Sequence, residues 1–438
     1  MNILRRAFVV LAAGGLGVPL LFAAATPRPG GAGGATTVTD DTAHAYGRAA
    51  ANLEPGHWTR LREGKMLFVR SWRPAGSGQA EGEGLGPLFN ARSCEACHFQ
   101  NGRGRLPDDP LRGEPALLFR LGLATGGPEP RYGGQLQDQA VPPARPEGRG
   151  QVSLLTLHGR YPDGLPYVLQ RPEVQLTGLR DGALASGTRV STRMPPSLVG
   201  LGLLQAIPAA DIVARADAGD TDGDGVSGRP HWVTPAGAAG PALGRFGWRA
   251  AHPTLVAQIG GALREDMGLT TAGGASPVPE VSAGQVERIA FYLSLLGVPE
   301  RRGADDPEVR RGEALFGRVG CSACHTPAFT TGGADLPELA GQEVHPYSDL
   351  LLHDMGDALA DGLPDDGGAG REWRTPPLWG LGRLGEVSGE VGLLHDGRAR
   401  RAEEAILWHG GEGRRARDAF AALDARSRAS LLRFLESL

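Results

Sequence analysis

The chain has 438 residues, which is long enough for two or three domains. Its formal net charge is −4, with acidic and basic residues interspersed, so the composition indicates neither a nucleic-acid surface nor a strongly acidic partner. The 68 glycines and 34 prolines predict much irregular backbone between short helices.

The N-terminus has the pattern of a secretory signal. Arg5 and Arg6 precede an apolar run that ends in small residues at Ala25, and this order is typical of a cleaved signal peptide. We therefore predict a periplasmic protein with a signal peptide over 1–25 and a flexible leader over 26–56. The alternative is an uncleaved membrane anchor, since the apolar run approaches the length of a span. No later segment is apolar enough to cross a membrane, so no membrane contact is expected after cleavage.

A Cys-x-x-Cys-His motif occurs twice and uses all four cysteines. Two thiols at this spacing can each form a thioether to a porphyrin edge, and the histidine that follows becomes the proximal iron ligand. The residues are Cys94, Cys97 and His98 in the first motif, and Cys321, Cys324 and His325 in the second. We therefore predict two covalently bound haem c groups.

The cysteines could instead bind zinc or form disulfides. A zinc site built from both pairs would not require a histidine directly after each pair, and the pairs lie far apart in the sequence. A disulfide within each pair would close a very small loop and would add little stability. Haem attachment, unlike either alternative, requires the histidine that directly follows each pair.

Each motif follows an amphipathic helix, predicted over 57–72 and 305–318. Both helices contain Gly-x-x-x-Phe, at Gly64–Phe68 and Gly312–Phe316, so the pattern is a weak internal repeat. A further helix over 281–296, with Ser282 as a possible N-cap, ends before Pro299. We place the boundary there, with an N-terminal haem lobe over 57–299 and a C-terminal cytochrome c domain over 300–438 that is closed by a helix at about 415–438.

Residues 150–260 of the first lobe are predicted to be insertions with short strands and turns, including a strand at 152–157. A calcium-type loop follows, in which three carboxylates occupy alternate positions of a tight turn that ends at Gly225. The carboxylates are Asp220, Asp222 and Asp224. Val226 would add a backbone carbonyl, and His231 stands where an EF-hand has glutamate, so Asp217 or a distant residue would have to complete the shell of a Ca²⁺ ion.

Several motifs outside the cysteine pairs point to one family. They lie at 84–93, 200–204, 220–225, 244–248, 351–356 and 408–411. Together with the two cysteine motifs, this set resembles the bacterial di-haem c-type oxidoreductases, which are named as peroxidases or thiol oxidoreductases. The resemblance runs from about residue 57 to the end. A thiol substrate has no support in the residues, since no cysteine is left for redox chemistry.

Residues 375–409 are similar to the second lobe of di-haem cytochrome c peroxidases, through Thr-Pro-x-Leu, His-Asp-Gly and Glu-Glu-Ala-Ile segments. In those enzymes a methionine on the last helix is the sixth ligand of the second haem. His409 falls at that position, so the resemblance implies His325 and His409 as the axial pair, and histidine in place of methionine lowers the potential. Met355 is the main rival ligand. His353 also competes, and His395 is expected to be structural.

The first haem has His98 as its proximal ligand. In the related peroxidases a glutamate after the first haem moves the proton between the peroxide oxygens, and Glu147 is our candidate here, with Gln135 lining the same pocket. Met194 or Met267 could instead close this site, and the protein would then pass electrons without binding peroxide.

From these features we predict a mainly α fold of two cytochrome c-like lobes, each with one covalent haem, with loop-rich insertions and a few short strands. The predicted function is that of a peroxidase-like oxidoreductase acting on hydrogen peroxide. The first haem would react, and the second would relay electrons to or from a periplasmic partner, with Trp248 on the path. The alternatives are an electron-transfer cytochrome without catalysis and an oxidase of a partner protein or metal.

Overall fold

The computed structural model describes residues 31–78, 82–104, 116–235, 238–272, 278–364, 370–389 and 391–438. Helices make up 32% of it and strands 19%, so the fold is mixed and leans towards helix, and the prediction of a mainly α chain is corrected in that respect. The strands of the described ranges pair only two by two, so they brace loops and do not form a central sheet. The predicted signal peptide lies outside the described residues.

The helices are α1 (Trp58–Val69), α2 (Cys94–Cys97), α3 (Leu201–Ala206), α4 (Ala209–Val213), α5 (Leu255–Met267), α6 (Ala283–Ser294), α7 (Pro307–Arg318), α8 (Leu384–Ser388), α9 (Ala402–Trp408), α10 (Arg414–Ala421) and α11 (Ala425–Ser437). The antiparallel pairs are β3 (Leu88–Phe89) with β5 (Gln139–Ala140), β4 (Leu118–Leu123) with β8 (Thr188–Arg193), β6 (Arg149–Arg160) with β7 (Pro166–Thr177), β9 (Trp232–Val233) with β10 (Ala242–Leu243), β11 (Phe329–Thr330) with β12 (Glu343–Val344), and β13 (Leu352–Asp354) with β14 (Glu372–Arg374). The parallel pair is β1 (Arg73–Pro74) with β2 (Glu83–Leu85).

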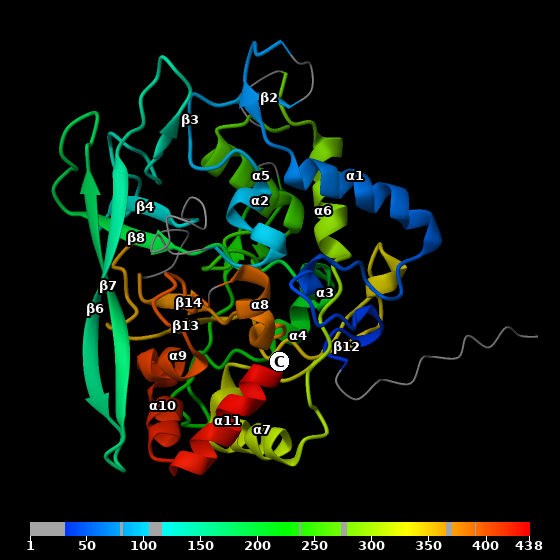
Figure 1. Ribbon diagram of the computed structural model, residues 1–438, viewed down its shortest axis with the longest axis vertical. Helices are drawn as coiled ribbons and strands as arrows, with labels where there is room; N and C mark the ends of the chain where they lie inside the picture. The colour runs from blue at the N-terminus through cyan, green and yellow to red at the C-terminus, as the bar shows by residue number, and fades with distance from the viewer. Residues whose placement is uncertain are drawn as a thin grey trace, which may run out of the picture.

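The Gly-x-x-x-Phe repeat packs in the same way in both halves of the chain. A Cβ added to Gly64 of α1 would overlap a carbonyl of α6 and lie 2.7 Å from Cβ of Tyr292, and one added to Gly312 of α7 would overlap a carbonyl of α11 and lie 2.7 Å from Cβ of Phe434. Aromatic contacts complete each crossing, with Phe68 against Tyr292 and Phe316 against Phe434. Glycine thus allows the close approach of two helices beside each cysteine motif, and Figure 1 shows the pair α7 and α11 near the C-terminus.

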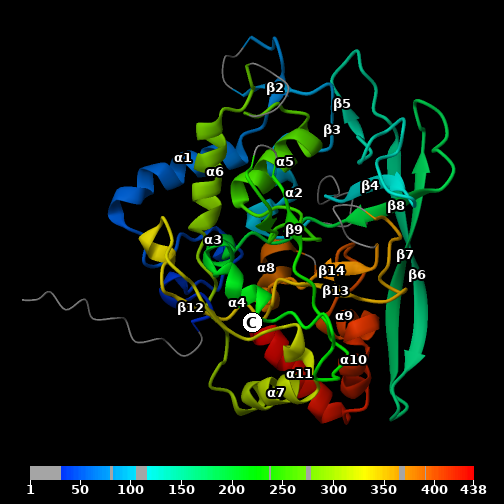
Figure 2. The ribbon, with the colours of Figure 1, turned by 180° about the vertical axis from the view of Figure 1, so that it is seen from behind.

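The β6–β7 hairpin stands along one side of the molecule, next to α9 and α10 (Figures 1 and 2). The strand predicted at 152–157 is confirmed within β6, and β8, β9 and β10 are short as expected in this region, but β6 and β7 are longer, with 12 residues each. Their side chains alternate between exposed and half-buried, which is the pattern of a ribbon packed on one face. Tyr161, at the turn, anchors the hairpin by donating a 2.7 Å hydrogen bond to Glu403 at the start of α9.

The described part of the predicted flexible leader is folded. Val38 donates a backbone hydrogen bond to the carbonyl of Val298 at 2.9 Å, and Tyr46 is fully buried with its hydroxyl bonded to the carbonyl of Gly380. The expectation of a flexible segment is therefore not met from residue 31 onwards, because apolar side chains of this segment enter the core. Within the described ranges, no helix is long and apolar enough to cross a membrane.

The helix ends follow local capping chemistry. Ser282 and Gln285 form a reciprocal capping box at the start of α6, which confirms the predicted N-cap. The single helix predicted at about 415–438 is instead two helices, α10 and α11. Asp424 causes the break, because its carboxylate accepts the backbone N–H of Ser427 at 2.8 Å and starts a new helix.

Candidate functional site

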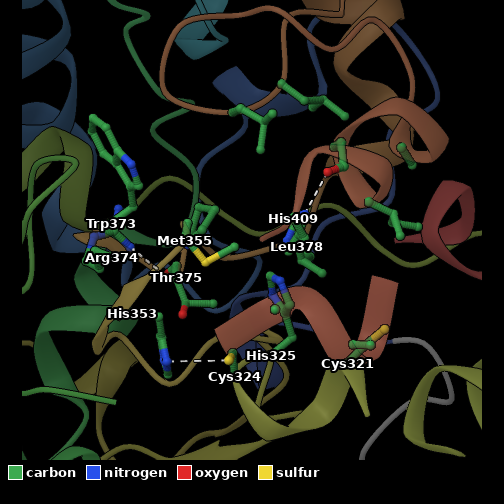
Figure 3. A pocket seen from close by; sticks show the side chains of 18 of the residues that line it. Cys321, Cys324, His325, His353, Met355, Trp373, Arg374, Thr375, Leu378 and His409 are labelled. Carbon is green, nitrogen blue, oxygen red and sulfur yellow. Dashed lines mark hydrogen bonds between the residues drawn. The ribbon is translucent and has the colours of Figure 1, made fainter. Parts of the chain in front are cut away.

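A largely apolar cavity surrounds the second cysteine motif (Figure 3). The chain reaches it from α7 through Gly320, whose φ of 95° is in the region that favours glycine. Cys321, Cys324 and His325 then line the cavity. Much of the remaining wall is apolar and includes Phe316, Leu378, Leu384, Leu393 and Ile406.

Two neutral imidazoles face this cavity. His325 donates from Nδ1 to the carbonyl of Tyr347 at 2.9 Å, and His409, which follows α9, donates from Nδ1 to the carbonyl of Ala405 at 2.6 Å. Burial lowers the pKa of His325 to about 4 and also lowers the pKa of His409. With Nδ1 used as a donor, Nε2 of each ring carries the lone pair that a metal ion would take.

Met355 enters the same cavity from the loop after β13. A Cβ on Gly411 would overlap the carbonyl of Asp354, and one on Gly410 would lie 2.9 Å from the carbonyl of Met355. The two glycines therefore let the Met355 loop pack directly against the segment that carries His409. The structure brings both predicted rivals for the sixth position to one site.

His353 lies beside the cavity but has no nitrogen available for a metal. Nε2 is 2.8 Å from the carboxylate of Asp349, and Nδ1 is 2.6 Å from the carboxylate of Glu412 and 3.5 Å from Sγ of Cys324. Burial alone would lower the pKa of His353, but these hydrogen bonds raise it well above its usual value. His353 is therefore a buried imidazolium that braces the wall of the cavity, and it is not a competing ligand.

The thiols and histidines fit the attachment of a c-type haem. All four cysteines are free, and burial is the main reason that the pKa of Cys94 and of Cys321 rises to about 12. In the part of the chain that the structure describes, the one group of three or more potential ligand side chains within metal-binding range consists of aspartates. The cysteines therefore form neither disulfides nor a shared zinc cluster, and each pair presents protonated thiols next to a neutral histidine.

The first cysteine motif is the short helix α2. Ser93 caps it by accepting the backbone N–H of Ala96 at 3.1 Å. His98 follows, donates from Nδ1 to the carbonyl of Pro196 at 2.8 Å, and has its pKa lowered to about 4 by burial. His98 and His325 are thus fixed by the same kind of hydrogen bond to a backbone carbonyl. Met194 is fully buried nearby, with Sδ 2.8 Å from where a Cβ on Gly104 would lie.

A polar network lies beside the first pair of cysteines. Gln135 donates from Nε2 to Oδ1 of Asp266 at 2.9 Å and to Oδ1 of Asn90 at 2.8 Å. Burial raises the pKa of Asp266 to about 6, and the negative charge of Asp266 adds to burial in raising the pKa of both Cys94 and Cys97. The predicted residue Gln135 is therefore placed next to the motif, together with a carboxyl group that the sequence analysis did not select.

Glu147 follows Gln135 in the chain and lies between β5 and β6. Its carboxylate accepts the backbone N–H of Gln137 at 2.8 Å, and Nε2 of Gln137 donates to the carbonyl of Glu265 at 2.9 Å. Glu147 is buried, and burial raises its pKa. The connection from Glu147 to the network around Asp266 thus runs through Gln137.

Trp248 lies between the two motifs. It lines the second cavity and donates from Nε1 to the carbonyl of Met194 at 2.8 Å, two residues before the Pro196 carbonyl that holds His98. The neighbouring wall contains His395, whose ring stacks on Trp373 at 3.7 Å between centroids. Burial lowers the pKa of His395 to about 3.

The acidic loop borders the second cavity. Carboxylate oxygens of Asp220, Asp222 and Asp224 lie within 4.8 Å of one another, and Asp224 and Val226 line the cavity. His231 is turned away, with Nδ1 2.7 Å from the carbonyl of Arg249. The neighbouring backbone N–H groups of residues 227 and 228 donate to the carboxylate of Glu412, which also holds His353.

Comparison with known families gives one match. The model of the family described as di-haem oxidoreductase, putative peroxidase, matches residues 28–118, 166–277 and 271–438, which is most of the chain. A search of curated proteins found no significant match.

Proposed function

The chain belongs to the di-haem oxidoreductase family, and on this premise we propose that it is an exported, peroxidase-like enzyme with two haem c groups. One haem is attached at Cys94 and Cys97, and the other at Cys321 and Cys324. In this proposal the first haem is the reactive centre, and the second stores and relays electrons. Helix α1 packs on α6 in the same way as α7 packs on α11. This repeated packing supports a cytochrome c-like lobe around each haem.

The difference between the two sites is the observation that supports this division of roles. At the second motif a neutral His409 shares the cavity with His325, and these two imidazoles would hold the iron of a haem bound there. At the first motif the neighbouring groups are the amide of Gln135 and the carboxyl of Asp266, which can orient and transfer protons. Substrate chemistry is therefore assigned to the first site.

When bound, the haems supply one-electron redox chemistry and, where an axial position is open, a place for peroxide to bind. The net reaction converts one hydrogen peroxide, two protons and two electrons into two waters. Because the pKa of Asp266 is raised to about 6, Oδ2 of this residue can hold and release a proton near neutral pH, while Gln135 fixes the group by its hydrogen bond to Oδ1. Glu147, buried with a raised pKa, is a second proton-carrying group and lies between β5 and β6.

The electrons have to pass between the sites. Trp248 lines the second cavity and is hydrogen-bonded to the segment that holds His98. We assign it to the path between the haems. The electron donor is a periplasmic protein in this proposal.

Two buried methionines favour electron transfer without catalysis as the second candidate function. Met267 directly follows Asp266 and is 2% exposed, and Met194 is fully buried beside Gly104. A thioether from either residue on the first iron would leave no open position. The same protein would then carry electrons only.

We also propose that the acidic loop binds Ca²⁺ through Asp220, Asp222, Asp224 and the carbonyl of Val226. Three carboxylates within 4.8 Å of one another are the type of ligand that Ca²⁺ prefers. The cation would lie next to the second cavity and would stabilise the loop that donates to Glu412.

Electron paramagnetic resonance of the oxidised, haem-loaded protein, with optical spectra before and after addition of peroxide, tests the proposal. We expect one high-spin haem that reacts with peroxide and one low-spin haem with two imidazole ligands. Two low-spin haems in both the oxidised and the half-reduced protein, unchanged by peroxide, would leave an electron carrier and exclude the peroxidase.

A further inference from the structure

Two guanidinium groups are buried in the wall of the second cavity without a carboxylate partner. Arg103 and Arg374 are 6% exposed and both line the cavity. Arg103 donates from Nη2 to the carbonyl of Leu394 at 2.7 Å, and Arg374 donates from Nε to the carbonyl of Gly247 at 2.9 Å and from Nη1 to the carbonyl of Thr375 at 3.0 Å. Over the described ranges of the chain, neither residue forms an ion pair within 4.0 Å.

The surroundings of Arg103 and Arg374 favour the binding of an anion. Burial lowers the pKa of both Arg103 and Arg374 to about 10, which is far above neutral, so both remain charged. Nε of Arg103 has no hydrogen-bond partner, and the same holds for Nε1 of Trp379, which is 4% exposed and also lines the cavity. A buried charge without a counter-charge is strongly unfavourable. Because both guanidinium groups line a cavity, a negatively charged group with oxygen acceptors in that cavity would be stabilised by them.

One part of a haem has the chemistry that these donors would bind, since the propionates are its negatively charged groups. In Figure 3, Arg374 and Cys321 lie on either side of His325. The thioether bonds of a c-type haem are on one edge of the porphyrin, and its two propionates are on the opposite edge. Guanidinium groups bind carboxylates through charge-assisted hydrogen bonds. We propose that Arg103 and Arg374, with Nε1 of Trp379, bind the propionates of the haem attached at the second motif.

The charge of Arg103 would affect the reduction potential of the second haem. It stands five residues after His98, so the segment of the first motif contributes a positive charge to the second cavity. Its backbone N–H is held by the hydroxyl of Ser388 at 3.1 Å, and its guanidinium lies 5.3 Å from the ring centre of Trp248. A positive charge near the propionates favours the ferrous haem, since the oxidised haem carries one more positive charge. Arg103 therefore raises the reduction potential of the second haem.

The experiment is a redox titration of the haem-loaded protein, followed by optical and electron paramagnetic resonance spectra, in the wild type and in Arg103→Gln, Arg103→Lys, Arg374→Gln and Arg245→Gln. The Cys94→Ser/Cys97→Ser protein, with haem attached only at the second motif, assigns the signals. Arg245 is the matched control. It is also buried, its pKa is likewise lowered to about 10, and it donates only to the carbonyls of Leu204 and Ile207.

We expect Arg103→Gln and Arg374→Gln to raise the ferric-to-ferrous ratio of the second haem about tenfold at a fixed potential, which is 59 mV for a one-electron couple. The first haem should shift less, Arg103→Lys should retain most of the wild-type potential, and Arg245→Gln should leave it unchanged. Unchanged potentials in both glutamine variants with two haems per chain, or an equal shift in Arg245→Gln, would overturn the assignment.

The inference rests on the proposed attachment of haem at the second motif, and the haem content of the wild type tests that separately. Fewer than two haems per wild-type chain would refute the proposed function itself. If Arg103→Gln does not load haem, Arg374→Gln and Arg103→Lys still give the comparison, because one removes a charge and the other keeps it.

Discussion

Gly312 offers a direct test of how the second haem site is held together. It lies in α7, and a Cβ there would overlap the backbone carbonyl of Ser430 and lie 2.7 Å from Cβ of Phe434 in α11. Neither neighbour is the flexible end of a side chain, so the two helices would have to separate. Alanine is intrinsically favoured over glycine in a helix by about 1 kcal/mol, but forcing extra atoms into a packed contact costs about 1–3 kcal/mol. Because backbone is involved, we expect the upper part of that range and a net destabilisation of about 1–2 kcal/mol for Gly312→Ala.

The same helix provides the control. Gly317 has nothing within 4 Å of an added Cβ, so Gly317→Ala should keep the propensity gain and stabilise the protein by up to about 1 kcal/mol. Urea unfolding of the haem-loaded variants, followed by far-ultraviolet circular dichroism, measures the difference between them. If Gly312→Ala were as stable as Gly317→Ala, the close crossing of α7 and α11 would not contribute to stability, and the reasoning would be refuted.

Three further predictions concern the sites. In electron paramagnetic resonance, His409→Ala should convert the low-spin signal of the second haem to a high-spin signal, or should raise the reduction potential of that haem. Met355→Leu should leave the low-spin signal unchanged. The reverse result would identify Met355 as the ligand. The pKa of Asp266 is about 6 in the folded protein against an ordinary value of 3.8. The free energy of unfolding therefore falls as the pH rises from about 4 to about 6, and it stays lowered above pH 6. Asp266→Asn should therefore be the more stable protein above pH 6 and should lose the advantage near pH 4 in thermal melts, and an unchanged pH profile would contradict the assignment. Removal of calcium with a chelator should lower the melting temperature of the wild type but not that of Asp222→Asn, and a wild type that is indifferent to both chelator and added calcium would exclude the metal site.

The features that sequence predicted well are those set by local chemistry. The two Cys-x-x-Cys-His motifs, the cap at Ser282 and the Gly-x-x-x-Phe repeat each depend on residues within a few positions of one another. The break between α10 and α11 was also local, since Asp424 with Ser427 is an N-cap pattern, but the apolar stripe on either side concealed it. The strand predicted at 152–157 lies within β6, but its full length of 12 residues was missed, because Gly150 and Gly159 on the half-buried face and Leu155 on the exposed face interrupt the alternation.

The site residues that were missed depend on contacts between distant segments. Asp266 meets Gln135 across 131 positions, and the only local signal was a carboxylate next to the buried Met267 on the apolar face of a helix. Arg103 follows the first motif in sequence but lines the second cavity. Its sequence neighbours therefore gave no sign that it belongs to the second site. The role of His353 likewise depends on Glu412, 59 positions away.

Pre-organisation favours His409 over Met355 as the proposed second ligand of the haem. The ring of His409 is fixed by the end of α9 and by the 2.6 Å hydrogen bond from Nδ1 to the carbonyl of Ala405, which points Nε2 away from that carbonyl. Met355 donates its backbone N–H to the carbonyl of Arg371, and its side chain has three rotatable bonds to order before sulfur can ligate. The entropic cost of fixing such a side chain is on the order of 1–2 kcal/mol, and this cost falls on Met355 alone. If His409 ligates as proposed, its imidazole would lower the potential of the second haem, and the proposed contact of Arg103 with the propionates would act in the opposite direction.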